Sequence, residues 1–360
     1  MNRKVLVIGP MDTGALAQSY ARAFERLGLE VVRFDSERAL RQASRFAGNR
    51  ILRRAMRPRL WNAVNREAVR VAESLQPALT FAVKCSFFHP ETIRRIRKLT
   101  GAPFVNYYPD NPYIGITWDP REASALRRDL IEVLRQYSMV FMWEHSLLQR
   151  MRSDGIETRY LSFAVDPDLF QPRALPEGLP CERCNSNHDV AFVATYTRSR
   201  GAEVAAIRRH TVGIWGINWP RDWRTPRGQH RAHAPVWGNA VSEIYARAPV
   251  SLNVLNAESL GGVNMRTFEI PGSGGVMLAR YSPGQDEFFP EDEAALYYRS
   301  PEEIDDKIDE LLRDASMRER LRRNAIRLAA EQTYDVRAAA VLRECGVSVP
   351  HAISRGSLTF

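Results

Sequence analysis

The feature that most constrains the fold is a double alternation of short apolar runs with helical patterns. In the first half of the chain the strand candidates are 5–8, 31–34, 79–83, 104–107, 139–142 and 160–163, with helical patterns such as 15–27 and 90–98 between them. In the second half the strand candidates are 190–194, 212–215, 251–255 and 276–279, with helices at about 202–209 and 264–270. Such alternation is typical of parallel sheets covered by helices on both faces. We therefore expect two α/β domains.

A stretch with little periodicity separates the two sets. It runs from residue 166 to 188 and contains Pro167, Pro172, Pro176 and Pro180, a composition typical of a linker. We expect an N-terminal domain over residues 1–170, a linker over 171–188, a C-terminal domain over 189–345 and a flexible tail over 346–360. Helices at about 301–313, 316–331 and 336–344 are expected to close the C-terminal domain.

Length and composition agree with two globular domains. The chain has 360 residues, 26% of them charged and 44% hydrophobic, which are values typical of folded proteins. No run approaches the length of a transmembrane helix. The apolar run at residues 5–8 is too short for a secretory signal, so we expect a cytoplasmic protein.

The segment from Gly261 to Leu278 is the strongest candidate site. It predicts a glycine loop, a short helix opened by Asn264, a second glycine turn and a buried strand. Backbone N–H groups at a helix N-terminus suit a phosphate. Arg266 can add a cation there, and Glu269 can accept hydrogen bonds from a ribose. The pattern favours a sugar-bearing nucleoside diphosphate; the alternative is an ordinary β–loop–α–loop–β unit with an Arg266–Glu269 ion pair.

The surroundings of this segment carry a resemblance to a known family. Residues 253–278, with Phe288, Phe289 and residues 300–304, resemble the C-terminal half of GT-B glycosyltransferases of the group 1 type. The closest resemblance is to their CgeB-like branch, with its pattern N-x-R-x-F-E, here residues 264–269. Further matches at 165–172, 189–200 and 332–337 extend the resemblance over about residues 100–340.

This resemblance implies the GT-B fold, with two Rossmann-like domains facing across a cleft. It also implies transfer of a sugar, expected to be a hexose, from a nucleoside-diphosphate sugar to a cell-envelope, spore-surface or other glycan acceptor, including a lipid-linked one. Better-known GT-B enzymes carry a second Glu eight residues before the donor Glu, and that position here is Gly261. Two alternatives therefore stay open: a nucleotide-sugar epimerase of the same fold, and a non-catalytic nucleotide- or glycan-binding protein.

Two arginines are candidates for the diphosphate. Arg198 and Arg200 follow the strand candidate 190–194, which places them on a β–α loop. One guanidinium group can bind two phosphate oxygens at the same time. Arg200 matches the family's arginine more closely. Arginines and backbone amides can stabilise a leaving diphosphate without a metal. Asp166 and Asp168 resemble a D-x-D metal motif only superficially and predict a turn, so we expect no catalytic metal and no cofactor besides the donor.

Candidates for the acceptor side lie in the first half. Asp110 follows the fourth strand candidate, and we expect it to contact the acceptor hydroxyl as a base or positioner; Asp-Asn-Pro also forms turns. His89 is a second candidate, although a helix N-terminus would explain it. The resemblance places the loop of Gly14 beside the acceptor and donor phosphates, whereas a tight turn would explain this glycine equally well.

The net charge of +9 is concentrated in one segment. Between Arg38 and Arg70 there are ten arginines and one acid, Glu67, interleaved with large apolar residues. This mixture suits peripheral contact with an anionic membrane; the alternative is a solvated helical pair. No nucleic-acid-binding motif accompanies the charge, so we expect no nucleic-acid partner.

The four cysteines do not form a disulfide framework, because Cys85 and Cys345 lie far from the other two. Cys181, Cys184 and His188 are three candidate zinc ligands, and a structural zinc site normally needs four. We interpret this segment as a polar linker.

Overall fold

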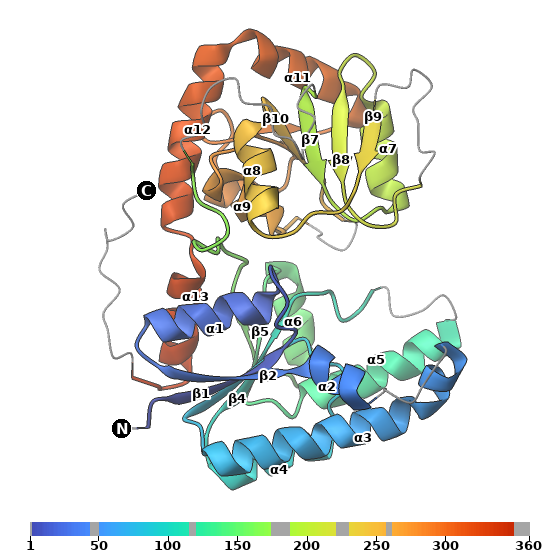
Figure 1. Ribbon diagram of the computed structural model, residues 1–360, viewed down its shortest axis with the longest axis vertical. Helices are drawn as coiled ribbons and strands as arrows, with labels where there is room; N and C mark the ends of the chain where they lie inside the picture. Colours follow the sequence, from blue (N-terminus) through green and yellow to red (C-terminus); the bar gives the residue numbers. More distant parts are fainter. Residues whose placement is uncertain are drawn as a thin grey trace. The chain divides into compact units, whose positions relative to one another are not determined.

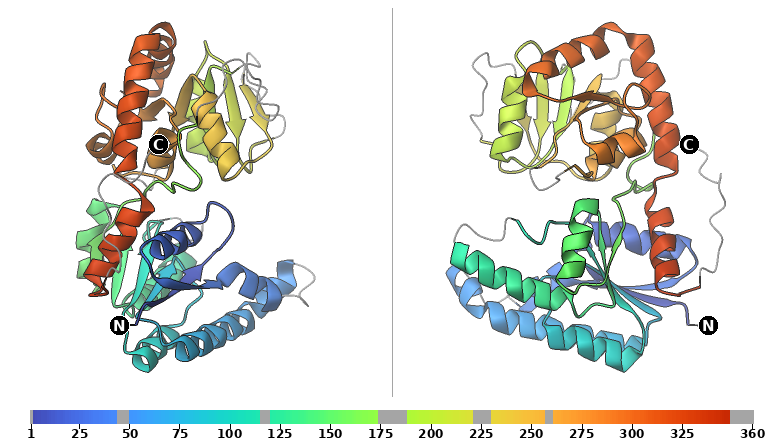
Figure 2. Two further views of the ribbon diagram at one scale, coloured as in Figure 1. Left: turned by 60° about the vertical axis from the view of Figure 1, so that its left-hand side comes forward. Right: turned by 180° about the vertical axis from the view of Figure 1, so that it is seen from behind.

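The computed structural model describes residues 2–43, 50–114, 120–173, 188–220, 230–256 and 261–348. Within these residues the chain divides into two compact units (Figures 1 and 2). Unit 1 contains the chain up to Ser162 and the last helix, α13 (Tyr334–Glu344), and unit 2 contains Phe163–Thr333. Most of the predicted linker, including Cys181 and Cys184, lies outside the described residues.

Unit 1 is built on a parallel sheet of six strands in the order β2-β1-β3-β4-β5-β6. Its strands are β1 (Lys4–Gly9), β2 (Glu30–Asp35), β3 (Leu79–Val83), β4 (Phe104–Tyr108), β5 (Met139–Met142) and β6 (Thr158–Tyr160). All six predicted strands of this half are present, although the sixth begins and ends earlier than expected. β3 and β4 are buried along their whole length, which explains their largely apolar character.

The helices of unit 1 cover both faces of this sheet (Figure 1). On one face lie α1 (Leu16–Arg26) and α13, and on the other lie α3 (Arg50–Leu75) and α4 (Pro90–Thr100). The remaining helices are α2 (Ser36–Ala43), α5 (Pro120–Leu134) and α6 (His145–Ser153). The sheet is therefore shielded from water on both faces, as the alternating pattern predicted.

Helix α13 packs within unit 1, although the sequence analysis assigned its residues to the C-terminal domain. The ring of Tyr334 lies 5.0 Å from that of Tyr20 on α1. Tyr20 in turn packs 4.6 Å from Phe81 on β3. At the surface, Arg26 Nη2 and Asp335 Oδ1 form an ion pair of 2.7 Å. The contacts of Tyr334 and Asp335 join residues about three hundred positions apart, and no local pattern reveals them.

The predicted basic segment falls largely on α3. Side chains of residues 43–57 lie outside the described part of the structure. Along α3 the apolar residues do not gather on one face, and Pro58 lies inside the helix. Arg70 Nη1 forms an exposed ion pair of 2.6 Å with Glu67 Oε2. None of the helices described has both the length and the apolar composition to cross a membrane.

Unit 2 is built on a second parallel sheet in the order β12-β11-β10-β7-β8-β9. Its strands are β7 (Val190–Val193), β8 (Val212–Trp215), β9 (His230–His233), β10 (Val250–Asn253), β11 (Met277–Arg280) and β12 (Leu296–Tyr298). Its helices are α7 (Arg198–Ala206), α8 (Asn239–Arg247), α9 (Arg266–Gly272), α10 (Pro283–Phe288), η2 (Pro301–Glu303), α11 (Ile304–Arg313) and α12 (Ala315–Ala330). Two of these strands, β9 and β12, were not predicted; they are short and lie at the two edges of the sheet.

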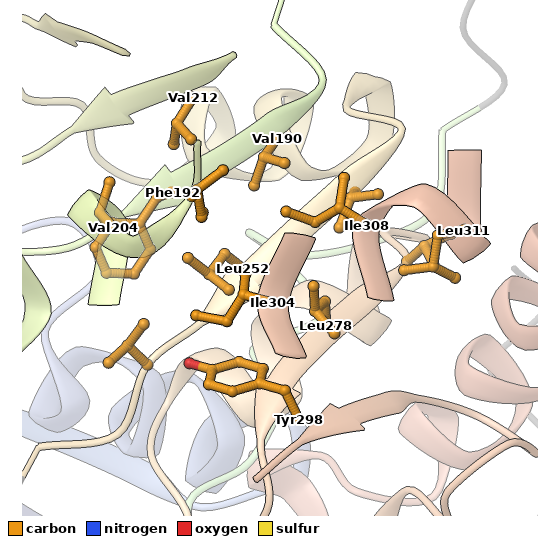
Figure 3. Close-up of a cluster of buried hydrophobic side chains, with 14 of the residues drawn as sticks. Val190, Phe192, Val204, Val212, Leu252, Leu278, Tyr298, Ile304, Ile308 and Leu311 are labelled. Carbon is orange, nitrogen blue, oxygen red and sulfur yellow. The ribbon is translucent and has the colours of Figure 1, made fainter. Parts of the chain in front are cut away.

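Alternate residues of the strands in unit 2 face two different cores. One core contains Phe192 and Leu252 from the sheet, packed against Val204 of α7 and Ile308 of α11 (Figure 3). On the other face, Ala191, Trp215 and Ile244 of α8 pack together. Because helices cover both faces, polar side chains of the strands can emerge only at the strand ends.

Candidate functional site

The carboxyl edge of the sheet in unit 2 holds the guanidinium group of Arg266. Its Nε donates to Asn253 Oδ1 at 3.2 Å, Nη1 donates to the carbonyl oxygen of Val193 at 3.5 Å, and Nη2 donates to that of Val254 at 3.4 Å. All three acceptors are neutral. Within the described residues no ion pair joins Arg266 to Glu269, so the alternative that explained both residues as a surface ion pair does not hold.

A buried polar network fixes the position of Arg266. Asn253 is fully buried, and its Oδ1 also accepts a hydrogen bond from Asn264 Nδ2 at 2.8 Å. Its Nδ2 donates to Gln285 Oε1 at 2.7 Å, and the same oxygen accepts from Thr267 Oγ1 at 3.1 Å. Thr267 and Gln285 were not among the predicted site residues. The available signal was Asn253, a polar residue inside the largely apolar run 250–255, because buried polar groups require partners.

The glycine loop differs in detail from the prediction. Helix α9 begins at Arg266, two residues later than expected, and Asn264 Oδ1 accepts from Thr267 N at 3.0 Å as a cap. Gly261 has a φ of 136°, and its carbonyl oxygen accepts from Gly284 N at 2.8 Å. The amide of Thr267 is thus already bound, and α9 has only seven residues. The guanidinium groups are therefore better candidate phosphate ligands than the N-terminus of α9.

Glu269 lies in α9, one turn after Arg266, and its side chain is half-buried. Burial raises the pKa of this carboxyl group from 4.5 to about 7; the Arg266 guanidinium lowers it and the Asp166 carboxyl raises it further. A carboxyl group with this pKa exchanges between its charged and neutral forms near neutral pH. It can therefore accept hydrogen bonds from two hydroxyl groups, or donate one and accept one.

Arg200 and Arg198 lie in the first turn of α7, whereas the prediction placed them on a loop before the helix. Thr197 caps this turn, since its Oγ1 accepts from Arg200 N at 3.2 Å. The Arg200 side chain is 7% exposed, and its Nη1 donates to the carbonyl oxygen of Thr195 at 3.0 Å. Arg198 is exposed. The structure thus directs Arg200 back toward the end of β7, and leaves Arg198 in solvent.

Tyr245 on α8 is a further residue that the sequence analysis did not identify. It is fully buried, and its hydroxyl group has no hydrogen-bond partner among the described residues. Burial raises its pKa far above the usual range, Glu269 raises the pKa further, and Arg266 and Arg200 lower it. The hydroxyl therefore lies within electrostatic range of all three predicted residues and remains a neutral donor.

Asp166 and Asp168 form a turn. Asp166 is 2% exposed, and its Oδ1 accepts from Asp168 N at 3.1 Å, as in an Asx-turn. Among the residues that the structure describes, no cluster of three or more His, Cys, Asp and Glu side chains could hold a metal ion. The absence of a catalytic metal stays a prediction.

His188, the described member of the three candidate zinc ligands, pairs with a histidine from β9. Its Nε2 lies 3.0 Å from His233 Nε2, and the ring of His233 stacks on Trp215. Burial lowers the pKa of His233 to about 4, and burial also lowers the pKa of His188. The sequence spacing gave no indication of this pairing, because the two histidines are 45 residues apart.

The carboxyl edge of the sheet in unit 1 holds Asp110. Its Oδ2 forms an ion pair with Lys84 Nζ, which follows β3. The next residue, Asn111, makes the local turn, because its Oδ1 accepts from Tyr113 N at 2.9 Å. The turn-forming role therefore falls on Asn111, and the Asp110 carboxylate remains partly open to solvent.

The two other predicted residues of unit 1 have local structural roles. His89 precedes α4, and its Nε2 lies 2.9 Å from Asn62 Oδ1 on α3. Gly14 has a φ of 83° in the loop between β1 and α1, a conformation that favours glycine. A Cβ atom there would meet nothing within 4 Å. The structure thus explains Gly14 by its backbone conformation.

Comparisons with known proteins agree with this architecture. The model of a family described as glycosyl transferase-like matches residues 199–343. No curated protein matches the chain significantly in sequence. Among solved structures, HepE from Anabaena in complex with UDP-glucose is similar, with 12% identity, a TM-score of 0.61, and coverage of 95% of this chain and 99% of that one.

Sucrose-phosphate synthase from Thermosynechococcus elongatus gives a TM-score of 0.65 at 10% identity, over 95% of this chain and 98% of that one. Trehalose 6-phosphate synthase from Burkholderia multivorans gives a TM-score of 0.62 at 12% identity, over 96% of this chain and 96% of that one. Residues 199–343 therefore match the glycosyl transferase-like family, and the chain has the GT-B fold, with two Rossmann-like parallel sheets.

Proposed function

We propose that this protein is a glycosyltransferase that uses a nucleoside-diphosphate sugar, and that unit 2 binds the donor. The observation that carries the proposal is the guanidinium group of Arg266. Its acceptors at the ends of β7 and β10 are all neutral among the residues that the structure describes. A partly buried cation without a carboxylate partner favours an anionic ligand, and ligands of open α/β sheets bind at the carboxyl edge.

The roles of the remaining residues follow from their positions. Arg200 adds a second guanidinium group for the diphosphate, and Glu269 accepts hydrogen bonds from the ribose. Asp110 in unit 1 receives the proton of the acceptor hydroxyl group. Because HepE is described in complex with UDP-glucose and with UDP, a UDP-sugar is the first donor to test. The CgeB-like branch, a hexose donor and a cell-envelope glycan acceptor belong to this proposal.

The test is donor binding, measured by calorimetry with UDP and UDP-glucose. Arg266→Ala should weaken donor binding by about 1.5–3 kcal/mol, the range for hydrogen bonds to charged groups. Arg313→Ala is the matched control, because it removes an exposed arginine from α11 in the same unit. If Arg266→Ala binds the donor as tightly as the control does, the proposed site is wrong.

Product analysis separates the proposed transferase from the two alternatives. A transferase releases free nucleoside diphosphate as it transfers the sugar. An epimerase changes the sugar without releasing nucleoside diphosphate, and a binding protein does neither. Release of the nucleoside diphosphate that continues in the presence of a chelator would agree with the proposed metal independence. Complete loss of release, restored by magnesium or manganese, would contradict it.

Contact of the basic segment between Arg38 and Arg70 with an anionic membrane is a separate proposal. Each arginine near such a surface contributes about 1 kcal/mol, and salt weakens the contribution. Sedimentation with anionic and neutral vesicles at low and high salt tests it. The expected result is salt-sensitive binding to anionic vesicles only. Equal binding to both vesicle types, or none, would leave the segment as a solvated surface.

A further inference from the structure

The end of β3 carries two consecutive residues in the left-handed region of backbone conformation. Lys84 has a φ of 64° and Cys85 has a φ of 48°. Residues other than glycine rarely adopt such values, because the Cβ atom crowds the neighbouring carbonyl group. Two in succession at the carboxyl edge of a sheet form a strained segment of the kind that clusters at functional sites.

The surrounding structure holds this segment in place. Lys84 N donates to the carbonyl oxygen of Tyr107 at 2.9 Å, and Asn106 Nδ2 donates to the carbonyl oxygen of Lys84 at 3.1 Å. Asn106 is fully buried in β4. Phe88 N donates to the carbonyl oxygen of Cys85 at 3.2 Å, which closes the following turn. The strain is thus imposed by bonds to the neighbouring strand and turn.

The strained conformation determines where two side chains go. Cys85 turns inward and is 4% exposed, whereas the Lys84 side chain is 52% exposed and reaches Asp110. The ion pair between Lys84 Nζ and Asp110 Oδ2 links the loops that follow β3 and β4. An exposed ion pair contributes little to stability by itself. Stability therefore does not explain why a strained backbone presents Lys84 to this carboxylate.

We propose that Lys84 is a positioning residue for Asp110. This inference rests on the proposed function. In the transfer step the acceptor oxygen forms a bond to C1 of the sugar while the bond from C1 to the diphosphate oxygen breaks, and the electron pair leaves with the diphosphate. The proton of the acceptor hydroxyl group passes to the Asp110 carboxylate. The ammonium group of Lys84 binds Oδ2 of Asp110 and so fixes the orientation of the carboxylate. Oδ1 of Asp110 then faces the acceptor hydroxyl group.

The experiment measures release of nucleoside diphosphate, with water or a glycan as acceptor, and donor affinity by calorimetry. Lys84→Met should lower kcat about tenfold and leave donor affinity unchanged, since the donor binds to unit 2. Lys84→Arg should restore most of the rate. In an Asp110→Asn background, Lys84→Met should cause no further loss, because the two residues act as one unit.

A second pair of variants separates strain from charge. Glycine adopts the left-handed conformation without strain. The Tm of Lys84→Gly should therefore equal or exceed that of the parent, while its kcat should fall. Gln76→Gly is the matched control, because Gln76 also has a positive φ, 48°, but lies before the amino end of β3. The Tm of Gln76→Gly should change in the same direction as the Tm of Lys84→Gly, and its kcat should stay at the parental value. Such a trade of stability for activity is expected of functional strain.

Two results would overturn the inference. One is a parental kcat in Lys84→Met, and the other is an equal loss of rate with and without Asp110. Failure of the proposed function gives a different result, because the parent protein then either binds no donor in calorimetry or binds it and releases no nucleoside diphosphate.

Discussion

The carboxyl edges of the two sheets carry their charges in opposite ways. In unit 2, Arg266 is held by neutral acceptors, and Asn253, Thr267 and Gln285 behind it are fully buried. In unit 1, Asp110 shares an exposed ion pair with Lys84 on a strained loop. A rigid, partly buried cation suits binding of an anion, whereas an accessible carboxylate suits proton transfer. The comparison therefore predicts that changes in unit 2 affect affinity and changes in unit 1 affect rate.

The largest expected effect tests the rate side of this comparison. Asp110→Asn keeps the shape of the side chain and removes its ability to take a proton. The turnover rate should fall about 10²–10⁴-fold, the usual contribution of a general base. Donor affinity in calorimetry should stay at the parental value. A parallel loss of donor affinity would break the comparison, because Asp110 would then serve donor binding.

Arg200→Ala tests the affinity side. Because the Arg200 guanidinium group is buried beside the end of β7, its removal should weaken donor binding by about 1.5–3 kcal/mol. Arg198→Ala is the control from the same helical turn, and its exposed side chain predicts a much smaller change. Calorimetry measures both variants, and thermal unfolding checks that each is folded. Unchanged donor affinity in both variants would place the diphosphate outside α7.

The raised pKa of Glu269 predicts a pH-dependent stability effect in unit 2. Burial makes the charged form costly, so the parent should lose stability as pH rises from 4.5 to about 7 and stay level above that. Glu269→Gln cannot ionise. It should stabilise the protein by about 1–3 kcal/mol at pH 8 and have no effect at pH 4. Urea unfolding at both pH values measures this difference, and a pH-independent effect would contradict the raised pKa.

The smallest expected effect concerns Tyr245, and it sharpens the comparison. Tyr245→Phe removes one buried hydroxyl group that has no partner among the described residues, so stability should not fall. If the hydroxyl donates to Glu269 or to the bound donor, affinity should fall by about 0.5–1.5 kcal/mol, the range for one neutral hydrogen bond. Tyr298→Phe is a control, since Tyr298 is equally buried, in the core of unit 2 that contains Phe192 and Leu252. An unchanged donor affinity would leave Tyr245 with a packing role only.

Local sequence patterns predicted much of the fold. Strands β1, β3 and β5 of unit 1 were predictable because each is a largely apolar run bounded by turns. β9 was missed because His230–His233 has one apolar residue, and β12 was missed because Leu296–Tyr298 is only 3 residues long. The starts of α7 and α9 were misplaced by a few residues, because capping by Thr197 and Asn264 depends on side-chain geometry.

The sequence by itself determined the alternation that gives two parallel sheets, and it brought Asn264, Arg266 and Glu269 together within six residues. Both depend on short-range periodicity, which the order of residues fixes directly. Only the tertiary structure decided that α13 completes unit 1, that Gln285 and Asn253 hold Arg266, and that Lys84 meets Asp110. These contacts join residues that are far apart in sequence, because parallel strands bring distant carboxyl ends to one edge of a sheet.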